Sequence, residues 1–146
     1  MNRKNLITLY NGLLSVANGS FVPIFEGKPV ELNMGYFSYS GDGYEPHCGS
    51  AGCAVGFAPL FGLKKRRSEN WFTYSGRIFN LNDDISWNWC FGENWSGPKY
   101  GTAAHAAQRI RHLLSGRPIP PLEGWGNWHK KHPLPKRPRP IKEESA

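Results

Sequence analysis

Long apolar runs are missing from this chain of 146 residues. No stretch approaches the roughly 18 consecutive apolar residues that a membrane-spanning helix needs, so we expect no membrane partner. The N-terminus begins with basic Arg3 and Lys4, as a signal peptide does, but polar residues such as Thr8, Asn11 and Ser15 interrupt the apolar stretch that follows. No cleavage site comes after it, and we therefore expect an intracellular, cytoplasmic protein.

Cysteine is scarce. The chain has three cysteines, and an odd number in a short chain makes a poor disulfide framework. We expect Cys48, Cys53 and Cys90 to remain thiols, as they would in a reducing cytosol.

Acidic residues are also in short supply, and the deficit is uneven. The formal net charge is +7, from 18 Lys and Arg against 11 Asp and Glu. Residues 1–128 carry twelve cationic residues against nine acidic ones, whereas residues 129–146 carry six against two. The excess therefore comes mostly from the C-terminal end and from one cluster, Lys64, Lys65, Arg66 and Arg67.

Several familiar signatures are missing as well. There is no Gly-Lys-Ser/Thr phosphate loop, zinc-finger spacing, helix-turn-helix or RNA-recognition motif. Paired catalytic carboxylates are not evident, because Asp83 and Asp84 stand where helix-capping acids belong. These absences argue against a P-loop nucleotidase and against sequence-specific nucleic-acid recognition by a known module.

Glycine, proline and aromatic residues are abundant: 17 Gly, 12 Pro and 14% Phe, Trp and Tyr. Apolar periodicity predicts a helix over 3–17 that ends at Asn18-Gly19, and Thr102 is a typical N-cap for a helix over 103–114. We also predict helices over 51–60 and from 69 to 79, the latter capped by Ser68, and a short aromatic helix or turn over 85–91. Residues 30–34 alternate as a strand does, within a small β-element near 30–40.

We accordingly predict an α+β fold, with a mostly helical globular domain over 1–124. Residues 125–146 are expected to form an extended, basic, Pro-rich tail.

The segment from Pro46 to Gly56 concentrates the candidate chemistry, since it holds His47, Cys48 and Cys53 among three glycines. Together with Cys90 these residues are a Cys3His set suited to zinc, although adjacent His47 and Cys48 fit the usual spacing poorly. Alternatively, Cys48 is a nucleophile ahead of a helix N-terminus, with His47 nearby and His105 or His112 as a more distant base. The simplest interpretation is a tightly packed helix start without metal or cofactor.

Basic and aromatic residues suggest a second kind of site. Lys64 to Arg67, Arg109 and Arg111 would contact phosphates or an acidic partner, and Trp125 and Trp128 would stack on bases or on a partner surface. A solvated charge run is the plain alternative for the same residues.

Three stretches resemble a group of small, uncharacterised proteins of tailed phages and their hosts. These are Cys48-Gly49-Ser50-Ala51-Gly52-Cys53-Ala54-Val55-Gly56, then Trp87-Asn88-Trp89-Cys90-Phe91, and then Ala103 through Leu114 around Arg109-Ile110. The resemblance covers roughly residues 45–115, with Ser50 where the group usually has Thr. It implies a phage or prophage source and no known activity. We therefore predict a non-enzymatic protein that binds a host macromolecule, such as a defence or regulatory protein, in the bacterial cytoplasm. A Cys48-dependent enzyme and a nucleic-acid-associated accessory protein are the alternatives.

Overall fold

The computed structural model describes residues 1–25, 27–29, 54–81, 83–92, 95 and 98–142. Its elements in chain order are α1 (Arg3–Ala17), β1 (Ile24–Phe25), β2 (Lys28–Pro29), α2 (Ala54–Phe57), the 3-10 helix η1 (Ala58–Phe61), α3 (Trp71–Phe79), α4 (Asp84–Phe91), the 3-10 helix η2 (Pro98–Tyr100), α5 (Ala103–Leu114), the 3-10 helix η3 (Leu122–Gly124) and α6 (Trp125–Lys131).

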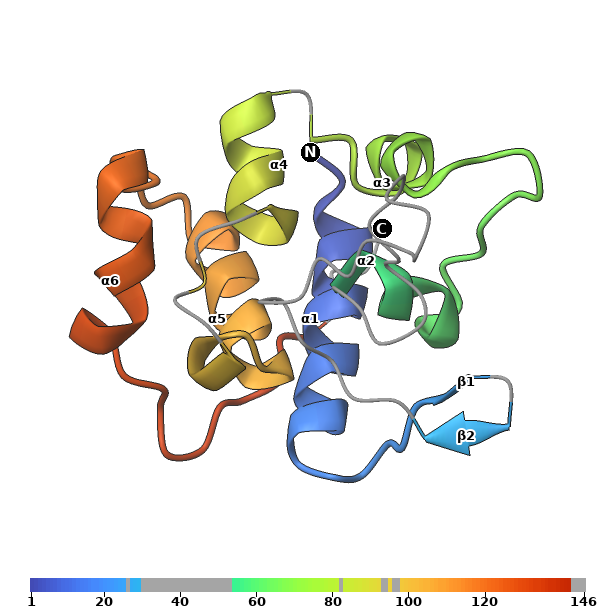
Figure 1. Cartoon of the computed structure of the whole chain (residues 1–146), viewed down its shortest axis with the longest axis horizontal. Coiled ribbons are helices and arrows are strands. Elements are labelled where there is room, and N and C mark those ends of the chain that lie inside the picture. The colour runs from blue at the N-terminus through green and yellow to red at the C-terminus, as the bar shows by residue number, and fades with distance from the viewer. Residues whose placement is uncertain (26, 30–53, 82, 93–94, 96–97, 143–146) are drawn as a thin grey trace.

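Helix α1 is the centre of the fold. In Figure 1 it stands between α5 and α6 on one side and α2 and α3 on the other. Its apolar side chains are buried along most of its length: Leu6, Ile7, Leu9, Tyr10, Leu13 and Leu14. Its most extensive helix–helix contact is with α5, which offers the small side chains of Ala103, Ala106 and Ala107. The close approach of these two helices follows from this pairing of large with small residues.

The predicted α+β class is wrong. The described residues form helices, and the β structure among them is a two-residue ladder that pairs Ile24 with Pro29 and Phe25 with Lys28. A ladder of this length supplies no sheet against which helices pack, because an isolated pair of strands is marginal even when longer. The strand predicted over 30–34 lies outside the described residues.

Short polar residues set the starts of the helices. The side chains of Asn2, Asn70, Asp83 and Thr102 each accept a hydrogen bond from a backbone N–H three residues on, at the starts of α1, α3, α4 and α5. The cap predicted at Thr102 is confirmed, as are the bounds of α1 and α5. Ser68 does not cap α3; Asn70 does, so α3 begins two residues later than predicted. Residues 54–61 form α2 and η1, and the start predicted at Ser50 lies outside the described residues.

The chain beyond residue 124 is part of the folded body rather than a free tail. Helix α6 buries Trp125, Trp128 and His129, and these tryptophans belong to the same core cluster as α1. Residues 133–142, which we call the C-terminal strap, return along α1, where Asn11 exchanges two hydrogen bonds with the main chain of Ile141. The domain boundary expected at 124 thus falls between η3 and α6, two elements that contact each other.

Across the described residues, no helix combines the length and the apolar character needed to cross a membrane.

Candidate functional site

The residues predicted for catalysis and metal binding are placed only in part. His47, Cys48 and Cys53 lie outside the described residues. Cys90 is fully buried on α4 between two aromatic neighbours, and burial raises the pKa of its thiol to about 12. Such a thiol is neither a nucleophile nor an accessible metal ligand at neutral pH. No group of three metal-ligating side chains occurs where side chains are described.

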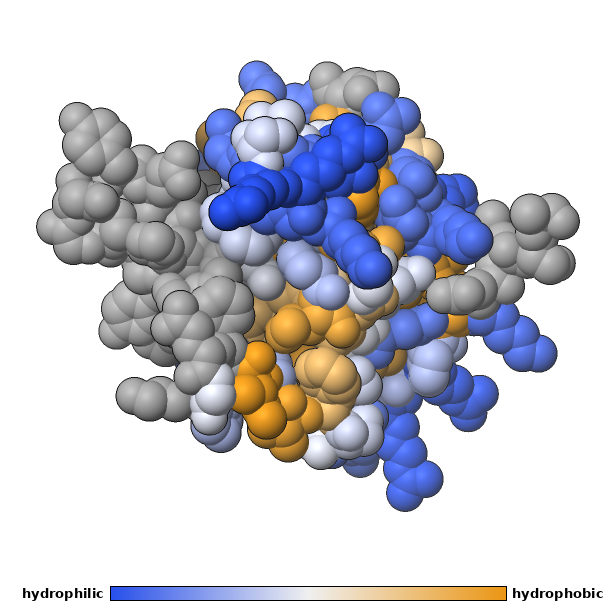
Figure 2. Space-filling model, turned by 90° about the vertical axis from the view of Figure 1, so that its right-hand side faces the viewer, coloured by the Kyte–Doolittle hydropathy of each residue, from blue (hydrophilic) through white to orange (hydrophobic). Residues whose placement is uncertain are grey.

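The predicted basic cluster occupies the turn ahead of α3. Lys64, Arg66 and Arg67 are exposed, and the Lys65 ammonium lies 5.2 Å from the centroid of the Trp71 ring. Glu69 holds the turn in place by accepting hydrogen bonds from Arg77, at 2.7 Å, and from the Arg66 N–H, at 2.8 Å. This turn and the β1–β2 ladder lie on the side of the molecule seen in Figure 2, where hydrophilic residues gather over the upper part.

Arg109 and Arg111 do not belong to that surface. Arg109 is fully buried between α4, α5 and α6, so its assignment to a nucleic-acid or partner contact is wrong. Arg111 is exposed and reaches the opposite way, donating to the Tyr10 hydroxyl at 2.9 Å and to the Arg139 carbonyl at 3.1 Å. Arg109 and Arg111 point in opposite directions because side chains two residues apart on a helix are separated by about 200° around its axis.

Trp125 and Trp128 are core residues, 3% and 6% exposed, and not the open stacking surface that the sequence suggested. Each packs edge-on against Trp89, with ring centroids 5.4 Å and 4.9 Å apart. The spacing of three residues, which places both on one face of α6, explains why both turn inward.

Arg109 is the centre of a buried polar cluster. Its guanidinium lies 3.7 Å from the Trp95 ring centroid and donates to His129 Nε2 at 3.1 Å and to the Trp89 carbonyl at 3.2 Å. On the far side of the ring, His129 Nδ1 lies 2.9 Å from Gln108 Oε1. Because Nε2 accepts from Arg109, the proton of the neutral imidazole belongs on Nδ1, where it is donated to Gln108.

Electrostatics keep this histidine neutral. Burial is the first cause that lowers the pKa of His129 to about 3, and the positive charge of Arg109 adds to it. Burial also lowers the pKa of His105, whose ring packs edge-on against His129 at 4.9 Å. Both ring nitrogens of His129 have partners within the fold, so this side chain cross-links α5 to α6.

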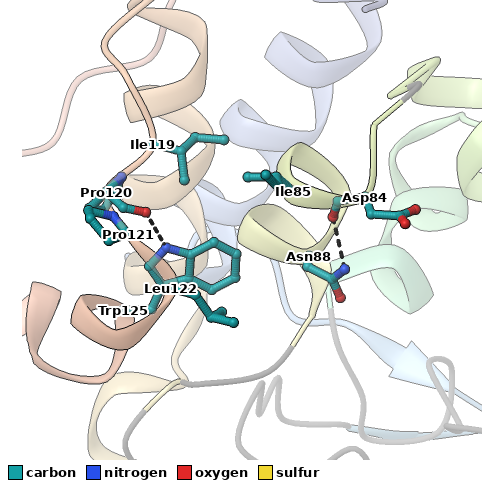
Figure 3. Close-up of a pocket in the computed structure, with 8 residues that line it drawn as sticks. All are labelled: Asp84, Ile85, Asn88, Ile119, Pro120, Pro121, Leu122 and Trp125. Atoms are coloured by element: carbon teal, nitrogen blue, oxygen red, sulfur yellow. Dashed lines mark hydrogen bonds between the residues drawn. The ribbon is translucent and has the colours of Figure 1, made fainter.

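A well-formed cavity lies elsewhere, between α4 and the segment that leads into α6. It has a volume of about 600 Å³, within the range of ligand sites. Figure 3 shows its two walls, which are formed by Asp84, Ile85 and Asn88 of α4 and by Ile119, Pro120, Pro121, Leu122 and Trp125. The indole N–H of Trp125 donates to the Pro120 carbonyl at 2.7 Å, which fixes the Pro-Pro wall against α6.

Apolar surface is exposed at this pocket. Ile85 and Leu122 are 61% and 59% exposed, on opposite walls. Each could be replaced by a polar residue without cost to the core, so their presence at the mouth of one cavity suggests a binding role. Sequence reasoning missed the site because residues 117–122 show no periodicity. The adjacent Pro120 and Pro121 were a signal of such a pocket wall, because proline has no backbone N–H that needs a hydrogen-bond partner.

The surroundings of this pocket are acidic although the chain is basic. The described acidic side chains are Glu69, Asp83, Asp84 and Glu123. Glu69 is paired with Arg77, whereas Asp84 lines the pocket and the exposed Asp83 and Glu123 adjoin lining residues. A hydrogen bond from the Ser86 N–H lowers the pKa of Asp83, which keeps this carboxylate ionised at neutral pH. Among the described lining residues there is no Lys or Arg.

No protein-family model matches this chain, and no curated protein or solved structure matches it either. The resemblance of residues 45–115 to phage proteins therefore stays a prediction. Its most specific motif, residues 48–56, lies mainly outside the described residues.

Proposed function

We propose that this protein is a non-enzymatic binding protein that receives an apolar segment of a host protein in the pocket between α4 and η3. The observation that carries the proposal is the presence of two large exposed aliphatic side chains, Ile85 and Leu122, at a cavity of about 600 Å³. A cavity of this size accepts one or two large apolar side chains of a partner, as the central pockets of protein interfaces do.

The charges around the pocket define the partner further. With Asp83, Asp84 and Glu123 beside it, the pocket favours an apolar segment that is flanked by Lys or Arg. Complementary charge would speed the encounter and would suppress partners with acidic flanks. The phage resemblance is the reason to look for this partner among bacterial host proteins.

The enzymatic alternative depends on Cys48, which lies outside the described residues. The described histidines give it no support. His105 Nδ1 lies 2.7 Å from the Thr102 hydroxyl, and His112 Nε2 lies 2.9 Å from the Pro118 carbonyl. The pocket has no described His or Cys in its lining. Its apolar walls favour binding over bond-making chemistry.

A comparison of matched surface variants tests the proposal. Ile85→Lys and Leu122→Lys place a cation at the pocket, whereas Ile24→Lys and Val22→Lys alter side chains of similar exposure, 56% and 60%, in the β1 region. All four positions are exposed, so folding is expected to be preserved within about 0.5 kcal/mol. We expect a protein recovered from bacterial lysate with the wild type to be lost with the pocket variants and retained with the other two.

Direct evidence comes from the Trp125 indole N–H resonance, which a Trp125→Phe variant assigns. Adding a peptide with an apolar face and Lys flanks should shift this resonance, because Trp125 lines the pocket, while a peptide with the same apolar face and Glu flanks should not. If the pocket variants retain every captured protein, or if neither peptide shifts the resonance, the proposed function is wrong.

A further inference from the structure

A row of cations is displayed along the C-terminal strap, residues 133–142. Between Glu123 and Glu143 the sequence has six Lys and Arg residues and no acid. Lys130 and Lys131 belong to the end of α6, and the other four lie on the strap: Lys136, Arg137, Arg139 and Lys142. All six are exposed. Where side chains are described, no carboxylate pairs with any of them, since the ion pair found there joins Glu69 and Arg77. Within the described part of the chain, the strap therefore carries four cations without a paired carboxylate.

The main chain of the strap is held by hydrogen bonds to α1 and α5, whereas its basic side chains are exposed. The Arg139 carbonyl accepts from the Tyr10 hydroxyl at 2.9 Å and from Arg111 at 3.1 Å. Asn11 donates to the Ile141 carbonyl at 2.7 Å and accepts from the Ile141 N–H at 2.9 Å. These bonds use peptide groups, so they leave the side chains of Lys136, Arg137 and Arg139 directed to solvent.

Two apolar side chains complete the attachment. Leu134 and Ile141 are partly buried, and the residues from 135 to 140 between them are exposed. Pro133, Pro135, Pro138 and Pro140 restrict the backbone between these anchors. The cavity between Leu134 and the faces of α1 and α5 is only about 30 Å³, which shows that the strap packs closely against these helices.

A cationic segment that is already ordered loses less conformational entropy on binding than a free tail does. The exposed strap residues between Leu134 and Ile141 include no aromatic or large aliphatic side chain that would insert into a protein pocket or a lipid layer. Their chemistry suits a regular series of negative charges, which a phosphodiester backbone presents.

We propose that the C-terminal strap is a preorganised surface for the sugar-phosphate backbone of nucleic acid, which it contacts without reading sequence. Lys136, Arg137 and Arg139 are the central contacts, and Arg111, whose guanidinium is fixed beside Arg139, adds to the same positive field. This surface is independent of the apolar pocket, which is lined by α4 and residues 119–125.

Binding of the full chain to a short DNA duplex and to an oligo-dT strand, followed by fluorescence anisotropy between about 50 and about 200 mM salt, tests this proposal. Replacing Lys136, Arg137 and Arg139 together by Ala should reduce the slope of log K against log salt by about 2.7 for the duplex, or by about 2.1 for the single strand. The nucleic acid with the greater affinity at equal salt identifies which form the strap prefers.

The matched control is Lys64→Ala with Arg66→Ala and Arg67→Ala. It removes the same charge from the exposed turn ahead of α3, and it should change the slope by less than about 1. A second variant, Asn11→Ala, leaves the charge unchanged but removes both bonds to Ile141, and it should weaken binding about tenfold with little change in slope. Circular dichroism establishes that each variant is folded.

Four outcomes would overturn the proposal. The first is that the full chain binds neither nucleic acid at low salt, and the second is that the turn variant reduces the slope as much as the strap variant does. The third is that Asn11→Ala binds as well as the wild type, which would contradict the role of the anchoring bonds. The fourth is that polyglutamate of matched length binds as tightly as DNA, which would assign the strap to acidic polypeptides instead.

Discussion

His129 and Arg109 illustrate how a buried polar pair is made tolerable in this fold. Both side chains are almost fully enclosed, 3% and 0% exposed, yet their hydrogen-bonding atoms have partners. The flat guanidinium lies against Trp95 and Trp89, which are apolar but attract cations through their ring faces. Removing either member would leave the other with an unmatched polar atom in the core, at a cost of about 1–3 kcal/mol.

The stability of the protein should fall as the solution becomes acidic. The pKa of His129 is lowered from 6.5 to about 3 in the fold, so between these values the unfolded chain binds a proton that the native chain does not. Stability from this group is therefore present above pH 6.5 and is lost as the pH falls. At pH 5 the loss from His129 should approach about 2 kcal/mol. His105, whose pKa is lowered too, adds to it in the same direction. Urea unfolding at several pH values between 5 and 7 measures the effect.

His129→Gln is the control for this pH dependence, because its amide also donates and accepts but does not titrate. We expect a lower stability at pH 7 and a flatter dependence on pH between 5 and 7, with His105 supplying what remains. A variant whose stability falls with pH as steeply as that of the wild type would show that His129 is not the responsible group.

Helices α1 and α3 each contain a glycine, and the surroundings of the two glycines differ. Gly12 of α1 faces η1, where a β-carbon would stand 2.5 Å from the Cγ and Cδ2 atoms of the Phe61 ring. Phe61 is itself fixed against Phe21, with ring centroids 5.4 Å apart. Gly76 of α3 has nothing within 4 Å of such a carbon. The first glycine is required by packing, and the second is not.

Alanine at these two positions should therefore act in opposite directions. Gly76→Ala should stabilise the protein by about 0.5–1 kcal/mol, because alanine is the better helix former and the site is open. Gly12→Ala should destabilise it by about 1–3 kcal/mol despite the same gain in propensity, since Phe61 must move. Denaturant unfolding of both variants measures the difference. Equal stabilisation by the two substitutions would mean that α1 and η1 are not in tight contact.

At the scale of the molecule, hydrogen bonds connect the N-terminal helix α1 to the C-terminal strap. The strap crosses α1 and α5, and its bonds span 129 positions of sequence from Tyr10 to Arg139 and 130 from Asn11 to Ile141. Its charge adds to that of a chain whose formal net charge is +7. Of the described acidic side chains, Asp84 lines the apolar pocket, and Asp83 and Glu123 each adjoin a lining residue in sequence. The proposed pocket and the basic strap are therefore separate surfaces of the molecule.

Deleting residues 133–146 should destabilise the whole fold. Tyr10 would lose its bond to the Arg139 carbonyl, and Asn11 would lose both bonds to Ile141. The core would also lose cover from Leu134 and Ile141, and the total cost should be on the order of 3 kcal/mol. The substitution of Lys136, Arg137 and Arg139 by Ala keeps the main-chain bonds and should change stability by no more than about 0.5 kcal/mol. Thermal unfolding of the two variants distinguishes a structural strap from a free tail, for which the deletion would leave the melting temperature unchanged.

Local sequence determined the helices that carry their own signals. The apolar spacing of α1 and the cap at Thr102 act over one or two turns, so both elements were predicted with their bounds. Tertiary structure decided what no local pattern encodes. From the sequence, Arg109 was predicted to be a surface cation, but in the fold it is buried among Trp89, Trp95 and His129. Trp125 and Trp128 are core residues because α6 folds back onto α5. The pocket and the strap exist only where segments far apart in sequence meet. Their physical basis is the burial of long-range contacts, which composition and periodicity do not specify.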